Sequence, residues 1–182
     1  MPGSDLTVPQ VGLNPTRMGF VEVLRRMGAS LESAEWGAPA GEPVGSLRAR
    51  HSRLKATTVE AAALPALIDE VPLLAVVASQ AYSLTRLCGL SELRHKESDR
   101  LAGTAAALSA MGAKARVEGD DLLVEGPCAL RGAAVKTLGD HRLTMAFTVA
   151  ALMAEGETTL SDAGSVAISF PGFFPTLAGL LA

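Results

Sequence analysis

The chain has 182 residues, of which 48% are hydrophobic and only 4% aromatic. This length allows one domain or one part of a larger protein, and the composition predicts a core of Ala, Leu and Val. The net charge of −3 and the scarcity of aromatic side chains argue against a nucleic-acid-binding surface. The two cysteines, Cys88 and Cys128, have neither metal-ligand nor disulfide spacing. We therefore expect no disulfide framework, no structural zinc site and a reducing, cytoplasmic environment.

Apolar stretches such as residues 71–78 are interrupted well before the ~18 to 20 residues that a membrane-spanning helix needs. The N-terminal residues carry no apolar run of signal-peptide length. We therefore expect a soluble protein that does not contact a membrane.

The first predicted helix covers residues 19–26, directly after Asn14-Pro15-Thr16-Arg17. Proline suits the first position of a helix because the N–H that it lacks would have no partner there. Gly28 stands where a left-handed residue commonly ends a helix, and a strand is predicted over residues 30–35.

Asp69 and Glu70 precede a second predicted helix, over residues 71–80, which a strand at 83–87 follows. An acidic residue at a helix start ordinarily caps the helix, and Pro72 in the first turn supports this interpretation. Asp69 also occupies the position in an internal repeat that corresponds to Asp140, so a capping role and a chemical role both remain open.

The next segment, residues 92–100, is rich in charge. Its simpler interpretation is a solvated loop in which Ser98 caps a helix over residues 101–110. The chemical interpretation is that Arg and Lys bind a carboxylate or phosphate while a neighbouring carboxylate exchanges a proton with a substrate. Gly112 is the expected end of the helix, and a hairpin of residues 114–118 and 122–125 follows.

Gly139-Asp140-His141-Arg142 opens another apolar helix, predicted over residues 143–154 and followed by a strand at 157–160. A single histidine near a helix is more often structural than catalytic. Here two potential cations stand together at a helix N-terminus, where they oppose the helix dipole, so the pattern favours a bound anion.

These segments follow one order, helix, two strands, helix and strand, repeated at a spacing of roughly 70 to 85 residues. The repeat units are expected at about 1–89 and 90–164, and a third begins at 165–182 with a helix over 173–181. The helices are so apolar that we expect them to pack together, with sheets outside. The predicted class is α/β.

Four motifs in order resemble the 5-enolpyruvylshikimate-3-phosphate synthase family. They are Asn14-Pro15-Thr16-Arg17, Lys96-Glu97-Ser98-Asp99-Arg100, Gly139-Asp140-His141-Arg142 with Met145-Ala146, and Ser169-Phe170-Pro171-Gly172-Phe173-Phe174. The resemblance covers essentially the whole chain. It implies an inside-out α/β barrel of βαβαββ units, one of the two domains of the family, and no metal or organic cofactor. The N-terminal domain of the family would then be absent.

The resemblance also implies a reaction and roles for residues. The family transfers the enolpyruvyl group of phosphoenolpyruvate to the 5-hydroxyl of shikimate 3-phosphate, with release of phosphate. Asp69 corresponds to the group that handles the hydroxyl proton, and Glu97 to its partner at the methylene carbon. Lys96 is expected to contact shikimate 3-phosphate and the reacting centre. Arg100 and Arg142 are expected to hold phosphoenolpyruvate, with His141 beside them.

Two positions depart from the family pattern. His95 stands where an apolar residue is common, and Ile168 stands where some members have a phosphoenolpyruvate-binding lysine. Because the chain is less than half of the family's usual length, we expect it to be inactive alone. The alternatives are a substrate-binding module, a structural remnant, or half of the related transferase that acts on UDP-N-acetylglucosamine.

Overall fold

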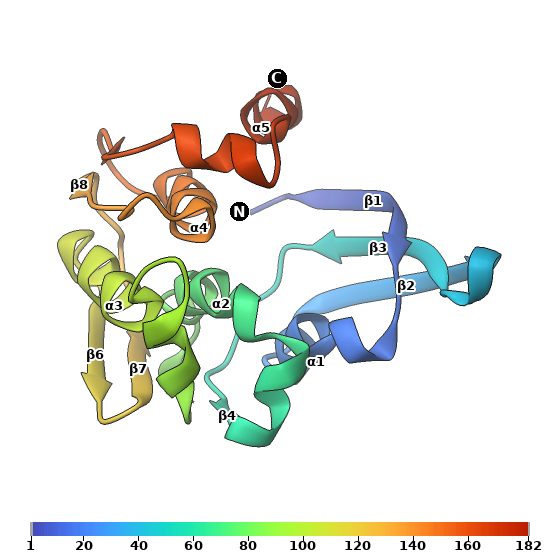
Figure 1. Cartoon of the computed structure of the whole chain (residues 1–182), viewed down its shortest axis with the longest axis horizontal. Helices are drawn as coiled ribbons and strands as arrows, with labels where there is room; N and C mark the ends of the chain where they lie inside the picture. Colours follow the sequence, from blue (N-terminus) through green and yellow to red (C-terminus); the bar gives the residue numbers. More distant parts are fainter. Residues whose placement is uncertain (1, 182) are drawn as a thin grey trace.

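The computed structural model describes residues 2–181, and its helices α2, α3 and α4 lie together with sheets around them (Figure 1). Helix α2 spans Val71–Ala78, α3 Arg100–Ala110 and α4 His141–Ala151. Each of the three packs against the other two. The N-terminal ends of these helices, where the predicted charged motifs lie, are thereby brought into one region.

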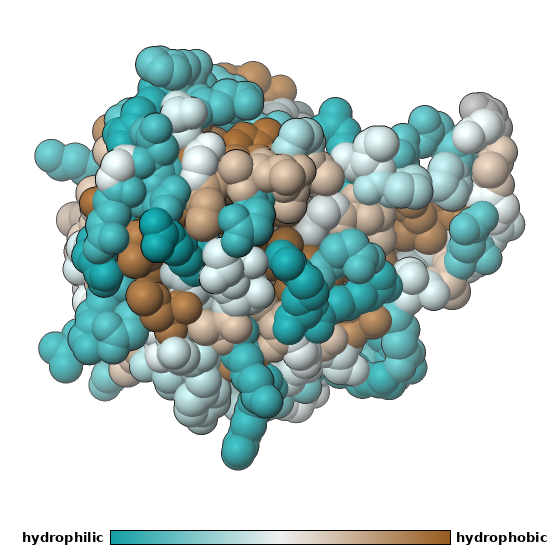
Figure 2. Space-filling model, turned by 90° about the horizontal axis from the view of Figure 1, so that it is seen from below, coloured by the Kyte–Doolittle hydropathy of each residue, from teal (hydrophilic) through white to brown (hydrophobic). Residues whose placement is uncertain are grey.

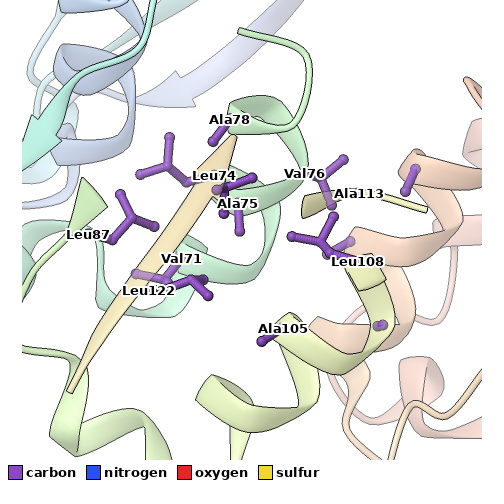
Figure 3. Packing of buried hydrophobic residues seen from close by; sticks show 14 of the residues in the cluster. Val71, Leu74, Ala75, Val76, Ala78, Leu87, Ala105, Leu108, Ala113 and Leu122 are labelled. Atoms are coloured by element: carbon purple, nitrogen blue, oxygen red, sulfur yellow. The ribbon is translucent and has the colours of Figure 1, made fainter. Parts of the chain in front are cut away.

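The central helix α2 is apolar on every side, and six of its eight residues are buried. Leu74 and Val76 of α2 have no exposed surface, and they pack with Leu108 of α3 and with Leu87 and Leu122 of the neighbouring sheet (Figure 3). A helix that is apolar all round is stable only when its whole circumference is covered. This packing therefore fixes α2 between the other two helices.

Three sheets surround the helices in the described part of the chain. The first has the order β1-β3-β2, with β1 at Asp5–Gly12, β3 at Val44–Arg50 and β2 at Ser30–Gly37. The second has the order β4-β5-β7-β6, with β4 at Thr58–Val59, β5 at Ser83–Leu87, β7 at Asp121–Gly126 and β6 at Lys114–Glu118. The third pairs β8, Ala134–Val135, with β9, Thr159–Leu160, in parallel.

Sheet membership groups the chain as 5–50, 58–126 and 134–160. Only the middle group is a full βαβαββ series in the described residues, with the order β4, α2, β5, α3, β6 and β7. The expected units 1–89, 90–164 and 165–182 have other bounds, and the repeat that they describe stays a prediction.

The first sheet projects to one side of the helical body, and Figure 2 shows the same projection from below. Helix α1, Gly19–Arg26, packs beside β2. Helix α5, Phe173–Leu181, has no buried residue and lies at the edge of the molecule in Figure 1. None of the helices in residues 2–181 is long and apolar enough to cross a membrane.

The predicted helices are confirmed with shifts of at most three residues at their ends, and Gly28 and Gly112 have the expected left-handed φ of 90° and 87°. Strands β1, β3, β4 and β8 were not predicted. The expectation that Ser98 caps α3 is wrong, because the cap is Asp99, whose side chain accepts the N–H of Ala102 at 2.9 Å. The Ser98 hydroxyl instead donates to Asp140, 42 residues away.

Candidate functional site

Two arginines and three carboxylates from different segments meet at the helix starts. Asp69 is the middle residue of a short 3-10 helix, Ile68–Glu70, that leads into α2. Arg100 is the first residue of α3, and Arg142 is the second residue of α4. We call Asp69, Glu97, Arg100, Asp140 and Arg142 the arginine cluster. Packing of α2, α3 and α4 places its members together although they span more than 70 positions of the sequence.

Arg100 is the buried centre of this cluster, with a side chain that is 1% exposed. Its Nε donates to Asp140 at 2.7 Å, its Nη1 to Asp69 at 3.2 Å and its Nη2 to Glu97 at 2.5 Å. A guanidinium can be buried only where its charge and donors are matched, and three carboxylates match them here. The side chain expected to hold phosphoenolpyruvate is thus bound to the chain's own anions.

Asp140 is also buried, with 0% of its side chain exposed, and it is the N-cap of α4. One of its oxygens accepts the backbone N–H of Arg142 at 2.9 Å, and the other accepts the Ser98 hydroxyl at 3.0 Å as well as Arg100. Burial is the largest influence on the pKa of Asp140 and acts to raise it. The hydrogen bond and charge of Arg100, with the N–H of Arg142 and the Ser98 hydroxyl, outweigh burial and hold this pKa below its usual 3.8.

Asp69 joins the two arginines. Its Oδ1 accepts from Arg100, its Oδ2 lies 3.3 Å from Arg142 Nη2, and its backbone carbonyl accepts Arg142 Nη1 at 3.2 Å. The Asp69 side chain makes no capping hydrogen bond to α2 in the described structure. The capping interpretation of Asp69 is therefore wrong, because both carboxylate oxygens face arginines.

The structure places the other predicted residues less centrally. Glu97 is beside Arg100 and 55% exposed. The Lys96 ammonium pairs with Glu92, four residues earlier, and not with the arginine cluster. His141 is half-buried at the first position of α4, and no other described residue forms a hydrogen bond or ion pair with its side chain. Lys96 and His141 are thus next to cluster members in sequence without joining their ion pairs.

A contact that sequence reasoning missed holds the loop before α3. The 3-10 helix Leu90–His95 precedes Lys96 and Glu97. Arg94 Nη2 donates to the carbonyl of Gly119 at 2.7 Å, and its Nε lies 3.2 Å from Asp120 Oδ1, both in the turn between β6 and β7. The backbone N–H of Leu90 donates to the Asp120 carbonyl at 2.7 Å. This turn therefore fixes the loop that carries the charged motif, and no signal in the sequence indicated the pairing.

The cluster combines two kinds of chemistry. Two partly exposed carboxylates, Asp69 at 28% and Glu97 at 55%, can exchange protons with a bound molecule, and the guanidinium of Arg142, 32% exposed, can bind a carboxylate or phosphate. Two surface depressions of about 400 Å³ and about 550 Å³ lie elsewhere, beside α3 and beside α1. The partly exposed side chains of Asp69, Glu97 and Arg142 thus leave the cluster open to the surface within the described chain.

The sequence profile of the family described as EPSP synthase (3-phosphoshikimate 1-carboxyvinyltransferase) matches residues 1–177. This chain belongs to the EPSP synthase family. Two curated relatives carry the name 3-phosphoshikimate 1-carboxyvinyltransferase. The protein of Acidiphilium cryptum is 48% identical over 180 residues, which are 99% of this chain and 40% of that protein. The protein of Acaryochloris marina is 46% identical over 177 residues, 97% of this chain and 40% of that protein.

Solved structures agree with this membership. EPSP synthase from Acinetobacter baumannii superposes with a TM-score of 0.93 at 34% identity, over 97% of this chain and 42% of that one. The enolpyruvyl transferase NikO from Streptomyces tendae superposes with a TM-score of 0.75 at 21% identity, over 98% and 39% of the two chains, and shares the fold. The predicted α/β enolpyruvyl transferase fold is confirmed. The chain spans about two fifths of the length of the relatives that it matches.

Proposed function

We propose that this chain supplies one part of the active site of a 3-phosphoshikimate 1-carboxyvinyltransferase. The convergence of Arg100 and Arg142 on Asp69 carries the proposal. In this reaction the 5-hydroxyl oxygen of shikimate 3-phosphate bonds to the second carbon of phosphoenolpyruvate while the methylene carbon gains a proton. Phosphate then leaves as the resulting methyl group gives up a proton and becomes a methylene carbon again. Two anionic substrates and two proton transfers call for cations and carboxylates in one site.

The proposed roles follow the contacts around the cluster. Asp69 takes the proton of the 5-hydroxyl, and Glu97 gives and removes the proton at the methylene carbon. Arg100 and Arg142 bind the phosphoenolpyruvate anion, because a guanidinium matches a carboxylate or phosphate with two parallel hydrogen bonds. The substrate would replace Glu97 and Asp69 on the outer nitrogens of Arg100. His141 and Lys96 would move from their present positions to contact the substrates.

The rest of the active site is proposed to come from a further domain that supplies more cations. Its cations would offset the charge of the second substrate anion, which the two cluster arginines cannot match alone. The free cysteines Cys88 and Cys128 favour a reducing compartment, so we propose that the enzyme works in the cytoplasm. The transferase that acts on UDP-N-acetylglucosamine is not favoured by any feature of the described cluster.

A hybrid enzyme tests the proposal. This chain replaces the matching segment of the Acidiphilium cryptum protein, and phosphate release is measured with phosphoenolpyruvate and shikimate 3-phosphate. We expect activity from the hybrid and none from the 182-residue chain alone. Glu97→Gln should lower kcat on the order of 100-fold or more, because it removes a proton-transfer group. Glu118→Gln, at an exposed ion pair in β6, is the matched control and should leave kcat unchanged.

A folded hybrid without phosphate release would overturn the proposal. Equal losses from Glu97→Gln and Glu118→Gln would leave the transferase assignment standing but would remove Glu97 from the chemistry.

A further inference from the structure

The Arg100 guanidinium has one protected partner and two exposed ones. Asp140, on Nε, is 0% exposed, whereas Asp69 and Glu97, on the two terminal nitrogens, are 28% and 55% exposed. An incoming anion can reach and displace only the exposed partners. The hydrogen bond from Nε to Asp140 therefore persists when an anion replaces Asp69 and Glu97 on the terminal nitrogens. This bond sets the plane in which the terminal nitrogens lie.

Asp140 is itself held from four directions. The N–H groups of Arg142 and Leu143 reach one oxygen at 2.9 Å and 3.4 Å, and Ser98 and Arg100 reach the other at 3.0 Å and 2.7 Å. Four donors for one carboxylate leave it little freedom to rotate. The position of Asp140 is thus fixed by the start of α4 and by the loop before α3 together.

The backbone before Asp140 supports the same orientation. Leu138 and Gly139 are both in the left-handed region, with φ of 56° and 69°. This conformation is unfavourable for leucine, since its Cβ crowds the backbone, and it is kept only where the surroundings require it. Two such residues in succession turn the chain so that Asp140 enters α4 with its carboxylate directed inward.

We propose that Asp140 is a positioning residue that fixes the Arg100 guanidinium for anion binding and couples its orientation to the start of α4. Asp140 does not touch the substrate, because its side chain has no exposed surface and both of its oxygens already accept hydrogen bonds that the substrate does not displace. One carboxylate thereby aligns two arginines, Arg100 through its side chain and Arg142 through its backbone N–H. The effect of Asp140 on catalysis rests on the proposed function. The claim that Asp140 fixes the orientation of the Arg100 side chain is separate from that function.

The hybrid enzyme tests the catalytic effect with Asp140→Asn. The amide retains an oxygen that can cap α4, but it lacks the charge that holds Arg100. We expect kcat to fall on the order of 100-fold, as for a misplaced binding group, and the KM for phosphoenolpyruvate to rise about tenfold. The KM for shikimate 3-phosphate should stay the same. A purely structural role would lower the fraction of active enzyme and leave both KM values unchanged.

Two further variants keep the test interpretable. Asp162→Asn changes another aspartate that accepts backbone N–H groups, those of Gly164 and Ser165, and that has no arginine partner among residues 2–181. It should alter kcat by less than about twofold. Ser98→Ala removes one hydrogen bond from Asp140 and leaves the cap of α4 intact. It should raise the KM for phosphoenolpyruvate about threefold even if Asp140→Asn does not fold.

An NMR measurement on the isolated chain tests the claim about Arg100 and does not depend on enzyme activity. In nitrogen-15 NMR spectra, the Arg100 Nε–H signal should be sharp and shifted in the wild type and in Asp162→Asn, and averaged with the other arginine signals in Asp140→Asn. An unchanged Arg100 signal in folded Asp140→Asn would overturn the inference. So would equal kinetic effects of Asp140→Asn and Asp162→Asn. If the wild-type hybrid is inactive, the proposed function fails, and the NMR result decides the positioning role alone.

Discussion

The helical body of α2, α3 and α4 differs from the β1-β3-β2 sheet in how it is held together. Six of the eight residues of α2 are buried, whereas none of the eight residues of β1 is. The sheet depends on ladder hydrogen bonds and on exposed ion pairs such as Arg48 with Asp5. The arginine cluster stands on the helical body. Groups that must be aligned closely are thus carried by the densely packed region, and the sheet contributes none of them.

Replacing one leucine by alanine in each region should give the largest difference between the two regions in the free energy of unfolding. Leu74→Ala in α2 should lower the free energy of unfolding by about 2 to 5 kcal/mol, because it leaves a cavity among residues with no exposed surface. Leu6→Ala in β1, where the side chain is 40% exposed, should cost less than about 1 kcal/mol. Urea unfolding of the 182-residue chain measures both. Equal losses would mean that the sheet is as tightly packed as the body.

The two regions should also differ in how strongly the stability that an aspartate contributes depends on pH. Because the folded pKa of Asp140 lies below the usual 3.8, its ionised form stabilises the fold above that pH, and the contribution is lost as the pH falls through the folded pKa. Asp140→Asn should therefore cost about 3 kcal/mol at pH 7 and progressively less below about pH 4.

Asp5→Asn is the matched change in the sheet. The hydrogen bond from Arg48 lowers the pKa of Asp5 in the same direction, but solvent screens this exposed pair. The effect of Asp5→Asn on the free energy of unfolding should be small at every pH. Unfolding free energies from pH 2.5 to 7 test both variants, and a pH-independent cost of Asp140→Asn would contradict the predicted charge effect.

The smallest predicted effect concerns the loop before α3. Arg94→Ala should lower the free energy of unfolding by about 1 kcal/mol, since the side chain is one-third exposed. It should also speed hydrogen exchange at the Leu90 amide, which bonds the Asp120 carbonyl. Arg48→Ala should speed exchange in β1 and leave Leu90 unchanged. Faster exchange at Leu90 in both variants would show that Arg94 does not hold this loop.

The helix starts and ends were the most predictable part of the fold. Pro15, Gly28 and Gly112 act through local backbone geometry, which the sequence displays directly. Strands β1, β3, β4 and β8 were missed because a strand gains its stability from a distant partner. In β1 the pattern is further obscured by an irregular register between Val8 and Val11.

The residues that form the candidate site were better predicted than the contacts between them. Motif resemblance named Asp69, Glu97, Arg100 and Arg142, and the fold brings these four together. The burial of Arg100 could not be foreseen, because two of its three carboxylates lie 31 and 40 residues away. The same limit applies to Ser98, whose local sequence indicates a cap while its hydroxyl binds Asp140.

The arginine cluster also affects how a charged molecule would approach this surface. Its two guanidinium groups are outnumbered by the three carboxylates of Asp69, Glu97 and Asp140, so the cluster as a whole carries excess negative charge. A phosphorylated molecule would be repelled weakly at long range and attracted only at contact. Added salt should then speed its encounter with this chain, the reverse of the usual behaviour of an anion-binding protein. Long-range attraction of such a molecule would have to come from cations outside the arginine cluster.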